Sequence, residues 1–442
     1  MTPLLMPCFA PVGTCAHTSS VPERPPESTP PCAAEGAAPS SGAGGGFASC
    51  DVAPARAGGR LLSIDAMRGL VMLLMTLDHV RGHFTYAAYA LWGDTTPLPP
   101  DPLNLHATTP LFFCMRWVTH LCAPSFIFLA GVSIHLWRQR HAMGHHLSAR
   151  LATRGLMLVG LNMALGVRDP LSADRVVVLD VLWPIGISML LLAFAVHLPR
   201  TVAWVVALLL VAGHDALHGV MLTGDVASIV WQLALVRSYI GVPGVGGLFI
   251  LYPVLPWFGV MWLGYLCGGF FAADNRARGR ALPRLGLAFL ACFVLLRLGA
   301  GYGDPVPFVV QDTAWRTAAA FVDVSKYPPS LQFVLVTLGG MWLLLAWFDT
   351  RCPRPGGQAF GCPGWLRLPG GAPLFYYVAH LAVIRALTPL LATTPSPMPE
   401  LAFSAAGIAF VAAGVFVVLL PACAWVARRR GVVRPTRKRG EA

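Results

Sequence analysis

The sequence predicts an all-α polytopic membrane protein, a bundle of about ten transmembrane helices. Of its 442 residues, 56% are hydrophobic and only 12% are charged, whereas soluble domains carry about 25% charged residues. Ten apolar stretches are each long enough to cross roughly 30 Å of hydrocarbon. Arg residues gather in alternate loops between these stretches. Together these features exclude a soluble fold.

The ends of the chain differ from its middle in composition. Residues 1–59 are rich in Pro, Gly, Ser and Ala and show no periodicity. Because such a composition cannot bury a core, we expect a disordered tail there. Residues 60–427 hold the membrane domain, and residues 428–442 form a basic tail that we expect in the cytoplasm.

Each apolar stretch predicts one helix, and the loops give the helices a direction. The ten predicted spans are 62–83, 112–137, 150–168, 176–197, 201–220, 247–272, 282–300, 330–348, 373–392 and 401–427. Arg residues cluster after the second, sixth and eighth spans and in the C-terminal tail. The positive-inside rule then predicts that both termini are cytoplasmic, N-in and C-in. The net charge of +12 is therefore a topology signal in a lipid bilayer, and we expect no nucleic-acid partner.

The first span carries more polar groups than a plain membrane anchor needs. On a helical wheel, Asp65, Arg68, Met72, His79 and His83 lie within roughly 60° of each other. Since charged groups at bilayer depth are costly, this stripe should face protein or water rather than lipid. The predicted direction of the first span places Asp65 and Arg68 near the cytoplasm and His79 and His83 near the outer face. Asp78 points away from the stripe, and we expect it to pair with another helix.

Further polar residues are predicted in the outer half of the membrane. Arg116 and His120 share a face of the second span, and Tyr376, Tyr377 and His380 share a face of the ninth. The remaining members of this layer are Asp180, His214, Asp215 and Arg385. A single intramembrane His often serves only as interhelical glue, which is the plainer interpretation for His120, His214 and His380.

Other motifs point to packing rather than chemistry. The 11 Cys show no metal-ligand spacing, so we expect no metal. The chain has no Walker, dinucleotide-binding or HExxH pattern. Gly131, Gly259, Gly264 and Gly268 are expected to permit close approach of helices.

Five motifs give the sequence a resemblance to a known family. They are RLLSIDAMRGLVMLLMTLDHV from residue 60, WVTHLCAPSFIFLAGVSIHL from residue 117, YPVLPWFGVMWLGYLCGG at 252–269, VSKYPPSLQFVLVTLG at 324–339 and APLFYYVAHL at 372–381. The combination resembles the heparan-alpha-glucosaminide N-acetyltransferase catalytic family in its bacterial membrane-protein branch, over roughly residues 60–395. The SIDAMRG element alone is shared more widely among transmembrane acyltransferases.

The resemblance implies a transferase that moves an acetyl or other short acyl group from cytosolic acyl-CoA to a sugar amine or hydroxyl across the membrane. The expected location is the bacterial inner membrane, the expected partners are acyl-CoA and a glycan or amino-sugar acceptor, and a homodimer is compatible with these features. In the family, a polar residue late in the first helix and a His in the next outer loop are held responsible for transfer. The first falls on His79, where the animal enzyme has Asn, and the second falls on His83, His106 or His120.

These implications fit the chemistry of the residues. Acyl transfer needs a general base near neutrality, for which His is the usual choice. We therefore expect catalytic roles for His79, His120, His83 and Arg116, the last as an oxyanion donor. Donor-binding roles are expected for Arg68, Asp65, Tyr376 and His380. An acyl-histidine intermediate and a direct ternary complex both remain open.

Two other functions compete with the transferase. A secondary transporter would bind a polar solute near the membrane midplane and would usually show internal repeats, which we do not find in this sequence. A non-catalytic scaffold would use the His residues only for packing. Binding of acyl-CoA distinguishes the transferase from both.

Overall fold

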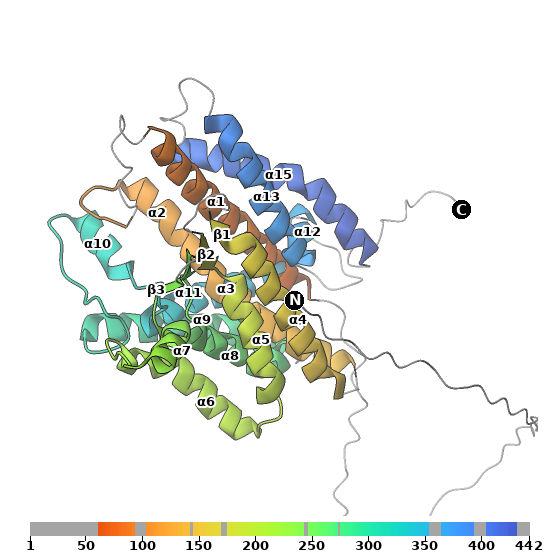
Figure 1. Ribbon diagram of the computed structural model, residues 1–442. Helices are drawn as coiled ribbons and strands as arrows, with labels where there is room; N and C mark the ends of the chain where they lie inside the picture. Colours follow the sequence, from red (N-terminus) through yellow and green to blue (C-terminus); the bar gives the residue numbers. More distant parts are fainter. Residues whose placement is uncertain are drawn as a thin grey trace, which may run out of the picture. The chain divides into compact units, whose positions relative to one another are not determined.

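The computed structural model describes residues 61–92, 103–141, 145–168, 175–242, 246–272, 275–352, 364–392 and 404–430. The predicted tail 1–59 lies outside these ranges, as do residues 431–442 of the predicted basic tail. The fold is mostly helical (Figure 1). Its helices are α1 (Leu62–Trp92), α2 (Pro110–Val118), α3 (Cys122–Arg140), α4 (His145–Gly166), α5 (Leu182–Ala195), α6 (Arg200–Ala212), α7 (Asp225–Leu235), α8 (Val254–Ala272), α9 (Asn275–Gly299), α10 (Ala314–Val322), α11 (Leu331–Arg351), α12 (Gly364–Gly371), α13 (Pro373–Ala392) and α15 (Ala405–Arg429).

The protein is an integral membrane protein of the helical class. Among the described residues, five helical segments are long and apolar enough to cross a membrane: 110–140, 254–272, 277–299, 331–351 and 405–429. The bent pair α12 and α13, which turns by 92°, would be a sixth. The predicted count of ten is therefore not reached by length and composition. The helices α5 and α6 have only 14 and 13 residues, and α1 carries Asp65, Arg68, Asp78 and Arg81.

A small sheet that the sequence analysis did not predict interrupts the helices. Its strands are β1 (Val167–Arg168), β2 (Val176–Leu179), β3 (Ser238–Val242) and β4 (Gly246–Ile250), in the order β1-β2-β4-β3. Strands β2 and β4 are parallel, and the other two pairs are antiparallel.

The structure corrects three of the predicted spans, two of them through the sheet. Span 176–197 begins as β2, and span 247–272 begins as β4. In span 201–220 the helix ends at Ala212 and a 3-10 turn, η2 (His214–Leu217), follows. For the two strands, the reason is that a short apolar run looks the same to hydropathy whether it forms a strand or a helix. Only the pairing of β2 with β4 across the fold distinguishes them.

Helix α1 is the element around which the site is built. It packs against α3, α11, α12, α13 and α15, and Figure 1 shows α13 and α15 running alongside it. A Cβ on Gly370 would lie 1.9 Å from the Asp65 carbonyl oxygen, and one on Gly69 would lie 1.6 Å from the Leu366 carbonyl oxygen. Only Gly therefore lets the backbone of α12 lie directly against α1.

Close glycine contacts also join α3 to α8. A Cβ on Gly131 would come within 2.0 Å of the Met261 carbonyl oxygen, and one on Gly264 within 2.1 Å of the Phe128 carbonyl oxygen. Cβ atoms on the other two predicted glycines, Gly259 and Gly268, would also clash with a neighbouring helix. The prediction that these glycines serve helix packing is confirmed.

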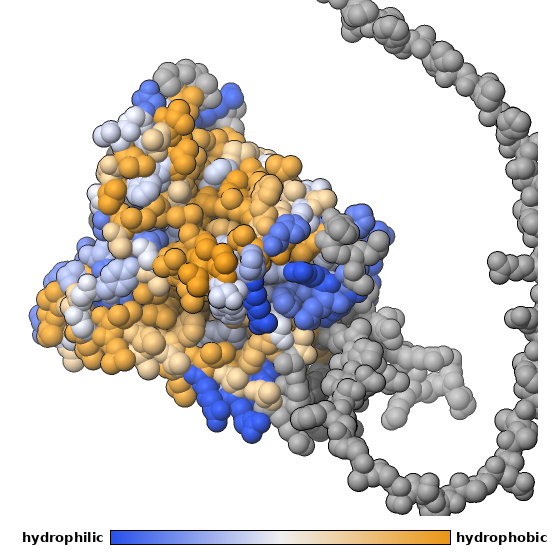
Figure 2. Space-filling view, turned by 90° about the horizontal axis from the view of Figure 1, so that it is seen from below, coloured by the Kyte–Doolittle hydropathy of each residue, from blue (hydrophilic) through white to orange (hydrophobic). Residues whose placement is uncertain are grey.

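Large apolar side chains cover much of the outer surface. Figure 2 shows hydrophobic residues over most of the face in view. Strongly exposed examples are Leu156 on α4, Leu209 on α6, Leu295 on α9 and Phe410 on α15. Exposed apolar area of this extent is expected where helices meet lipid.

Candidate active site

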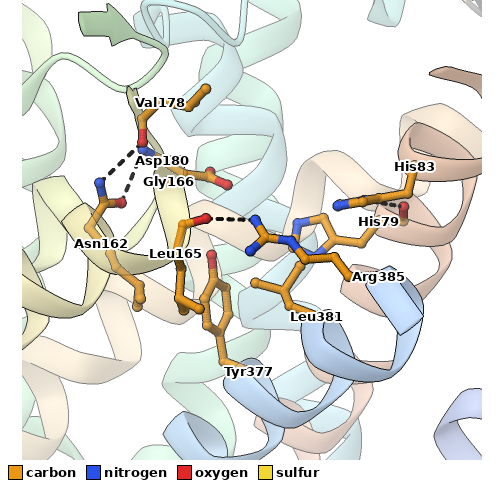
Figure 3. Close-up of a pocket in the computed structure, with 11 residues that line it drawn as sticks. His79, His83, Asn162, Leu165, Gly166, Val178, Asp180, Tyr377, Leu381 and Arg385 are labelled. Carbon is orange, nitrogen blue, oxygen red and sulfur yellow. Dashed lines mark hydrogen bonds between the residues drawn. The ribbon is translucent and has the colours of Figure 1, made fainter. Parts of the chain in front are cut away.

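A pocket opens between α1, α4, β2 and α13. Its polar lining consists of His79 and His83 from α1, Asn162 from α4, Asp180 after β2, and Tyr377 and Arg385 from α13 (Figure 3). The rest of the wall is formed by Leu165, Gly166, Val178, Leu182 and Leu381. The pocket thus combines imidazole, carboxylate, phenol and guanidinium groups from segments far apart in the sequence.

The imidazole of His79 is held by a second His from another helix. His79 Nδ1 lies 2.7 Å from His380 Nε2, and the two ring planes are within 9° of parallel. His380 Nδ1 in turn lies 2.9 Å from the backbone carbonyl oxygen of Tyr376. Because His380 has no exposed surface, it supports His79 from behind.

The contacts fix which nitrogen carries each proton. A carbonyl oxygen only accepts, so Nδ1 of His380 donates to Tyr376, and in the neutral ring its Nε2 is an acceptor. His79 must then donate from Nδ1, which makes its Nε2 the basic nitrogen. This is the geometry of a general base whose tautomer and orientation are set by a neighbouring group.

His83 lies beside His79 on the pocket wall. Its Nδ1 is 3.0 Å from the His79 carbonyl oxygen, one helical turn earlier, and the two rings meet edge to face at 6.4 Å. Since Nδ1 donates to that carbonyl, Nε2 is also the acceptor nitrogen of His83.

The opposite wall is built by hydrogen bonds that hold β2 against α4. The Asn162 amide donates to the Val178 carbonyl oxygen at 3.1 Å and accepts from the Asp180 backbone at 3.1 Å. Asp180 also accepts from the Val181 backbone, where α5 begins. Arg385 donates to the Leu165 carbonyl oxygen at 2.6 Å and so ties α13 to the end of α4 (Figure 3).

A second polar cluster lies on the other side of α1, centred on Asp78. Arg116 contacts both carboxylate oxygens at 2.9 and 3.0 Å. Arg81 lies 3.0 Å away and Lys326 3.9 Å away. The prediction that Asp78 pairs with another helix is confirmed, because Arg116 belongs to α2. We call these four residues the Asp78 cluster.

Two phenols and a buried imidazole border the Asp78 cluster. The Tyr327 and Tyr252 hydroxyls are 3.3 Å apart, and the Lys326 ammonium lies 5.0 Å from the Tyr327 ring. Burial, and next the neighbouring Tyr327, raises the pKa of Tyr252 well above its ordinary value, so this phenol is neutral. His120 is 1% exposed and packs edge-on against Phe333 at 5.6 Å.

The motif SKYPPS places Lys326 and Tyr327 in this position. Asp304 accepts from the Ser325 backbone at 2.8 Å and from the Ser330 hydroxyl at 2.7 Å. Asp215 accepts from the Leu331 backbone at 2.7 Å, and His214 contacts the Pro329 carbonyl oxygen at 2.8 Å. His214 and Asp215, both expected in the outer polar layer, therefore fix this segment and do not line the pocket.

The structure separates the predicted site residues into groups. His79 and His83 line the pocket, with His380 behind them, whereas Arg116 and His120 belong to or border the Asp78 cluster. Met72, on the predicted stripe, is buried. His106 is exposed in the loop before α2.

The three predicted donor-binding residues other than His380 make internal contacts. Arg68 donates to the Leu129 carbonyl oxygen at 2.8 Å and to the Ser133 hydroxyl on α3. Asp65 is 3% exposed. The Tyr376 hydroxyl lies 2.6 Å from the Thr76 hydroxyl, and its ring stacks on His380.

Sequence reasoning gave no role to Asn162, Lys326 or Tyr252. Asn162 is a polar residue in an apolar span, a signal that was available. Lys326 lies in a quoted motif between predicted spans, so no helical face pointed to it. Tyr252 lies near the start of the predicted span 247–272, but it follows a strand and precedes α8, so a helical face would have misplaced it. Within the described ranges, no three His, Cys, Asp or Glu side chains converge in a geometry that could hold a metal ion.

Comparison with known proteins identifies the family of the chain. None of the curated proteins searched matches the sequence. The profile of the family described as heparan-alpha-glucosaminide N-acetyltransferase, catalytic, matches residues 60–296, more than half of the chain and all of the elements that carry His79, Asn162, Asp180 and Arg116. The chain therefore belongs to the heparan-alpha-glucosaminide N-acetyltransferase catalytic family.

Proposed function

We propose that this protein is a membrane acyltransferase that moves an acetyl or other short acyl group from acyl-CoA to a sugar amine or hydroxyl. Membership of the family supports an acetyltransferase activity. The observation that carries the proposal is the relay from the Tyr376 carbonyl through His380 to His79, which leaves a basic nitrogen at a pocket.

In the proposed reaction, Nε2 of His79 accepts the proton of the acceptor hydroxyl or amine as that group attacks the thioester carbonyl. The carbon–sulfur bond then breaks, and the CoA thiolate takes the proton back from His79. The positive charge that forms on His79 strengthens its hydrogen bond to His380. This relay favours direct transfer, in which His79 acts as a base.

Tyr377 and Arg385 are the pocket groups best suited to stabilise the oxyanion. Both line the pocket with His79, and both carry hydrogen-bond donors. Arg116, expected in this role, instead contacts Asp78 on the far side of α1. We therefore assign Arg116 to acceptor binding rather than to the oxyanion.

We further propose ten membrane-crossing helical segments with both termini in the cytoplasm, in a bacterial inner membrane. In this topology acyl-CoA enters from the side of Asp65 and Arg68, and the acceptor binds at the outer face beside His79. The Arg-rich loops support this orientation. The observation against it is Cys352, which is disulfide-bonded at the end of α11, because disulfides are rare in the cytosol. Labelling of single Cys residues introduced at 138–141 decides the orientation, and labelling from outside would reverse it.

The direct test is incubation of the purified protein with radiolabelled acetyl-CoA and amino-sugar acceptors. We expect transfer by the wild type, loss of at least about a hundredfold in His79→Ala, and unchanged transfer in His218→Ala, whose imidazole is exposed and outside the site. His120→Ala should weaken acceptor use without abolishing acetyl-CoA binding. Absence of both acetyl-CoA binding and label transfer would refute the transferase and leave the transporter or scaffold.

A further inference from the structure

We propose that Arg150, Arg154 and Arg430 form a binding site for the phosphate headgroup of an anionic phospholipid. We call these three residues the arginine cluster. The site concerns the membrane around the protein, so it depends neither on the proposed transfer reaction nor on the direction in which the chain crosses the bilayer.

The first argument is that three guanidinium groups from two helices lie together without a counterion. Arg150 and Arg154 are one turn apart on α4, and Arg430 caps the end of α15. Arg154 lies within electrostatic reach of both other cations. In the described part of the chain, no carboxylate lies within 4 Å of any of the three. Three like charges repel one another unless an anion binds between them, and a phosphate can accept two hydrogen bonds from one guanidinium group.

The second argument is that the arginine cluster lies at the depth of the lipid headgroups. All three arginine side chains are exposed, and two tryptophans accompany them. The Arg150 guanidinium carbon lies 4.4 Å from the centre of the Trp137 ring, and that of Arg429, next to Arg430 in the chain, lies 4.1 Å from the centre of the Trp425 ring. Trp is enriched at the boundary between hydrocarbon and water, so both pairs are typical of the headgroup layer.

The third argument is that one face of α4 changes from charged to apolar beside the arginine cluster. At about 100° per residue, Arg150, Arg154, Met157 and Leu161 lie within roughly 60° of each other. Met157 is 51% exposed, and Leu161 is half-buried. The acyl chains of a phospholipid can cover these apolar side chains while its phosphate contacts the two arginines. Inorganic phosphate or CoA would leave them uncovered, and we therefore assign the site to a lipid.

A lipid bound here would also join the two groups of helices that flank the pocket. Helix α4 packs against α5 and β2, whereas α15 packs against α1, α12 and α13. The pocket lies between these two groups. The hydrogen bond from Arg385 on α13 to the Leu165 carbonyl oxygen bridges them at the C-terminal end of α4. A phosphate that contacts Arg154 and Arg430 together bridges them nearer its N-terminal end, so we expect the bound lipid to stabilise the fold.

Native mass spectrometry of the purified protein in mild detergent measures lipid binding directly. The protein is titrated with phosphatidylglycerol, which is anionic, and with zwitterionic phosphatidylcholine that has the same acyl chains. We expect the first phosphatidylglycerol to bind at least about tenfold more tightly than phosphatidylcholine. The double variant Arg150→Gln, Arg154→Gln should lose that preference, and because both side chains are exposed it should still fold.

The matched control removes the same charge elsewhere. Arg280 and Arg284 on α9 are also exposed and four residues apart, and the double variant Arg280→Gln, Arg284→Gln should keep the preference for phosphatidylglycerol. In lipid nanodiscs, adding phosphatidylglycerol to phosphatidylcholine should raise the thermal midpoint of the wild type and of this control, and should leave that of the α4 double variant unchanged.

Three outcomes overturn the inference. The first is equal binding of the two lipids by the wild type. The second is an equal loss of preference in the two double variants, because the attraction would then come from net charge alone. The third concerns CoA, the other source of phosphate. If the α4 double variant binds acetyl-CoA more weakly in calorimetry but keeps its preference for phosphatidylglycerol, the arginine cluster serves the donor and the inference is wrong.

Discussion

Replacing His380 tests whether the His pair is catalytic. In His380→Phe the acceptor 2.7 Å from His79 Nδ1 is lost, while an aromatic ring still fills the fully buried site. In His380→Gln the amide oxygen can take the place of Nε2 and accept the same hydrogen bond. The two variants therefore separate the hydrogen bond from the packing.

The magnitude follows from the charge that His79 gains in the transition state. A hydrogen bond to a charged group contributes about 1.5–3 kcal/mol. At about 1.4 kcal/mol for each factor of ten, His380→Phe should lower kcat about 10- to 150-fold. His380→Gln should recover most of this loss, and KM for acetyl-CoA should change little in either variant.

The assay is initial-rate transfer from radiolabelled acetyl-CoA, with thermal stability measured in parallel to confirm that each variant is folded. A folded His380→Phe protein with wild-type kcat would refute the relay. So would equal losses in the Phe and Gln variants, since the effect would then come from shape alone.

Three further predictions concern stability and loop order. Asp78→Asn leaves three cations that are at most 17% exposed without their carboxylate partner and should lower the free energy of unfolding by about 3 kcal/mol. The change is seen as a lower thermal midpoint in detergent, which the exposed-pair variant Asp312→Asn does not share. Gly264→Val places a side chain where even a Cβ would lie 2.1 Å from the Phe128 carbonyl oxygen, so it should separate α3 from α8 and abolish the folded form, whereas a stable variant would contradict the packing. Arg297→Met removes four hydrogen bonds to backbone carbonyls at 2.8–3.0 Å around α10 and should speed limited proteolysis within residues 301–330, and an unchanged cleavage rate would count against this role.

The helical membrane fold could be predicted because hydropathy acts along the chain. A run of apolar residues must leave water wherever it lies in the fold, so every predicted span contains a helix. The lengths of these helices could not be predicted from hydropathy in the same way. The strands β2 and β4 pair with each other across about seventy residues of sequence, and this pairing shortens the helices that follow them.

The site was only partly visible in the sequence. The stripe of α1 gave His79, His83 and the turned position of Asp78, because helical geometry alone fixes which residues share a face. The same geometry placed Tyr376 and His380 together on α13. It could not show that His380 meets His79, or that the Tyr376 hydroxyl bonds to Thr76, because these contacts join two helices about 300 residues apart.

The sequence by itself determined that this is a helical membrane protein of a known transferase family, with two imidazoles, His79 and His83, in the C-terminal half of α1. Tertiary structure alone decided the tautomer of His79, since the acceptor that sets it belongs to α13. It also decided that Lys326 reaches Asp78, since a loop position follows no helical periodicity and is fixed here by the hydrogen bonds of Asp304 and Asp215. The physical reason is that periodicity and hydropathy act within one segment, whereas proton positions and charge balance depend on groups that only folding brings together.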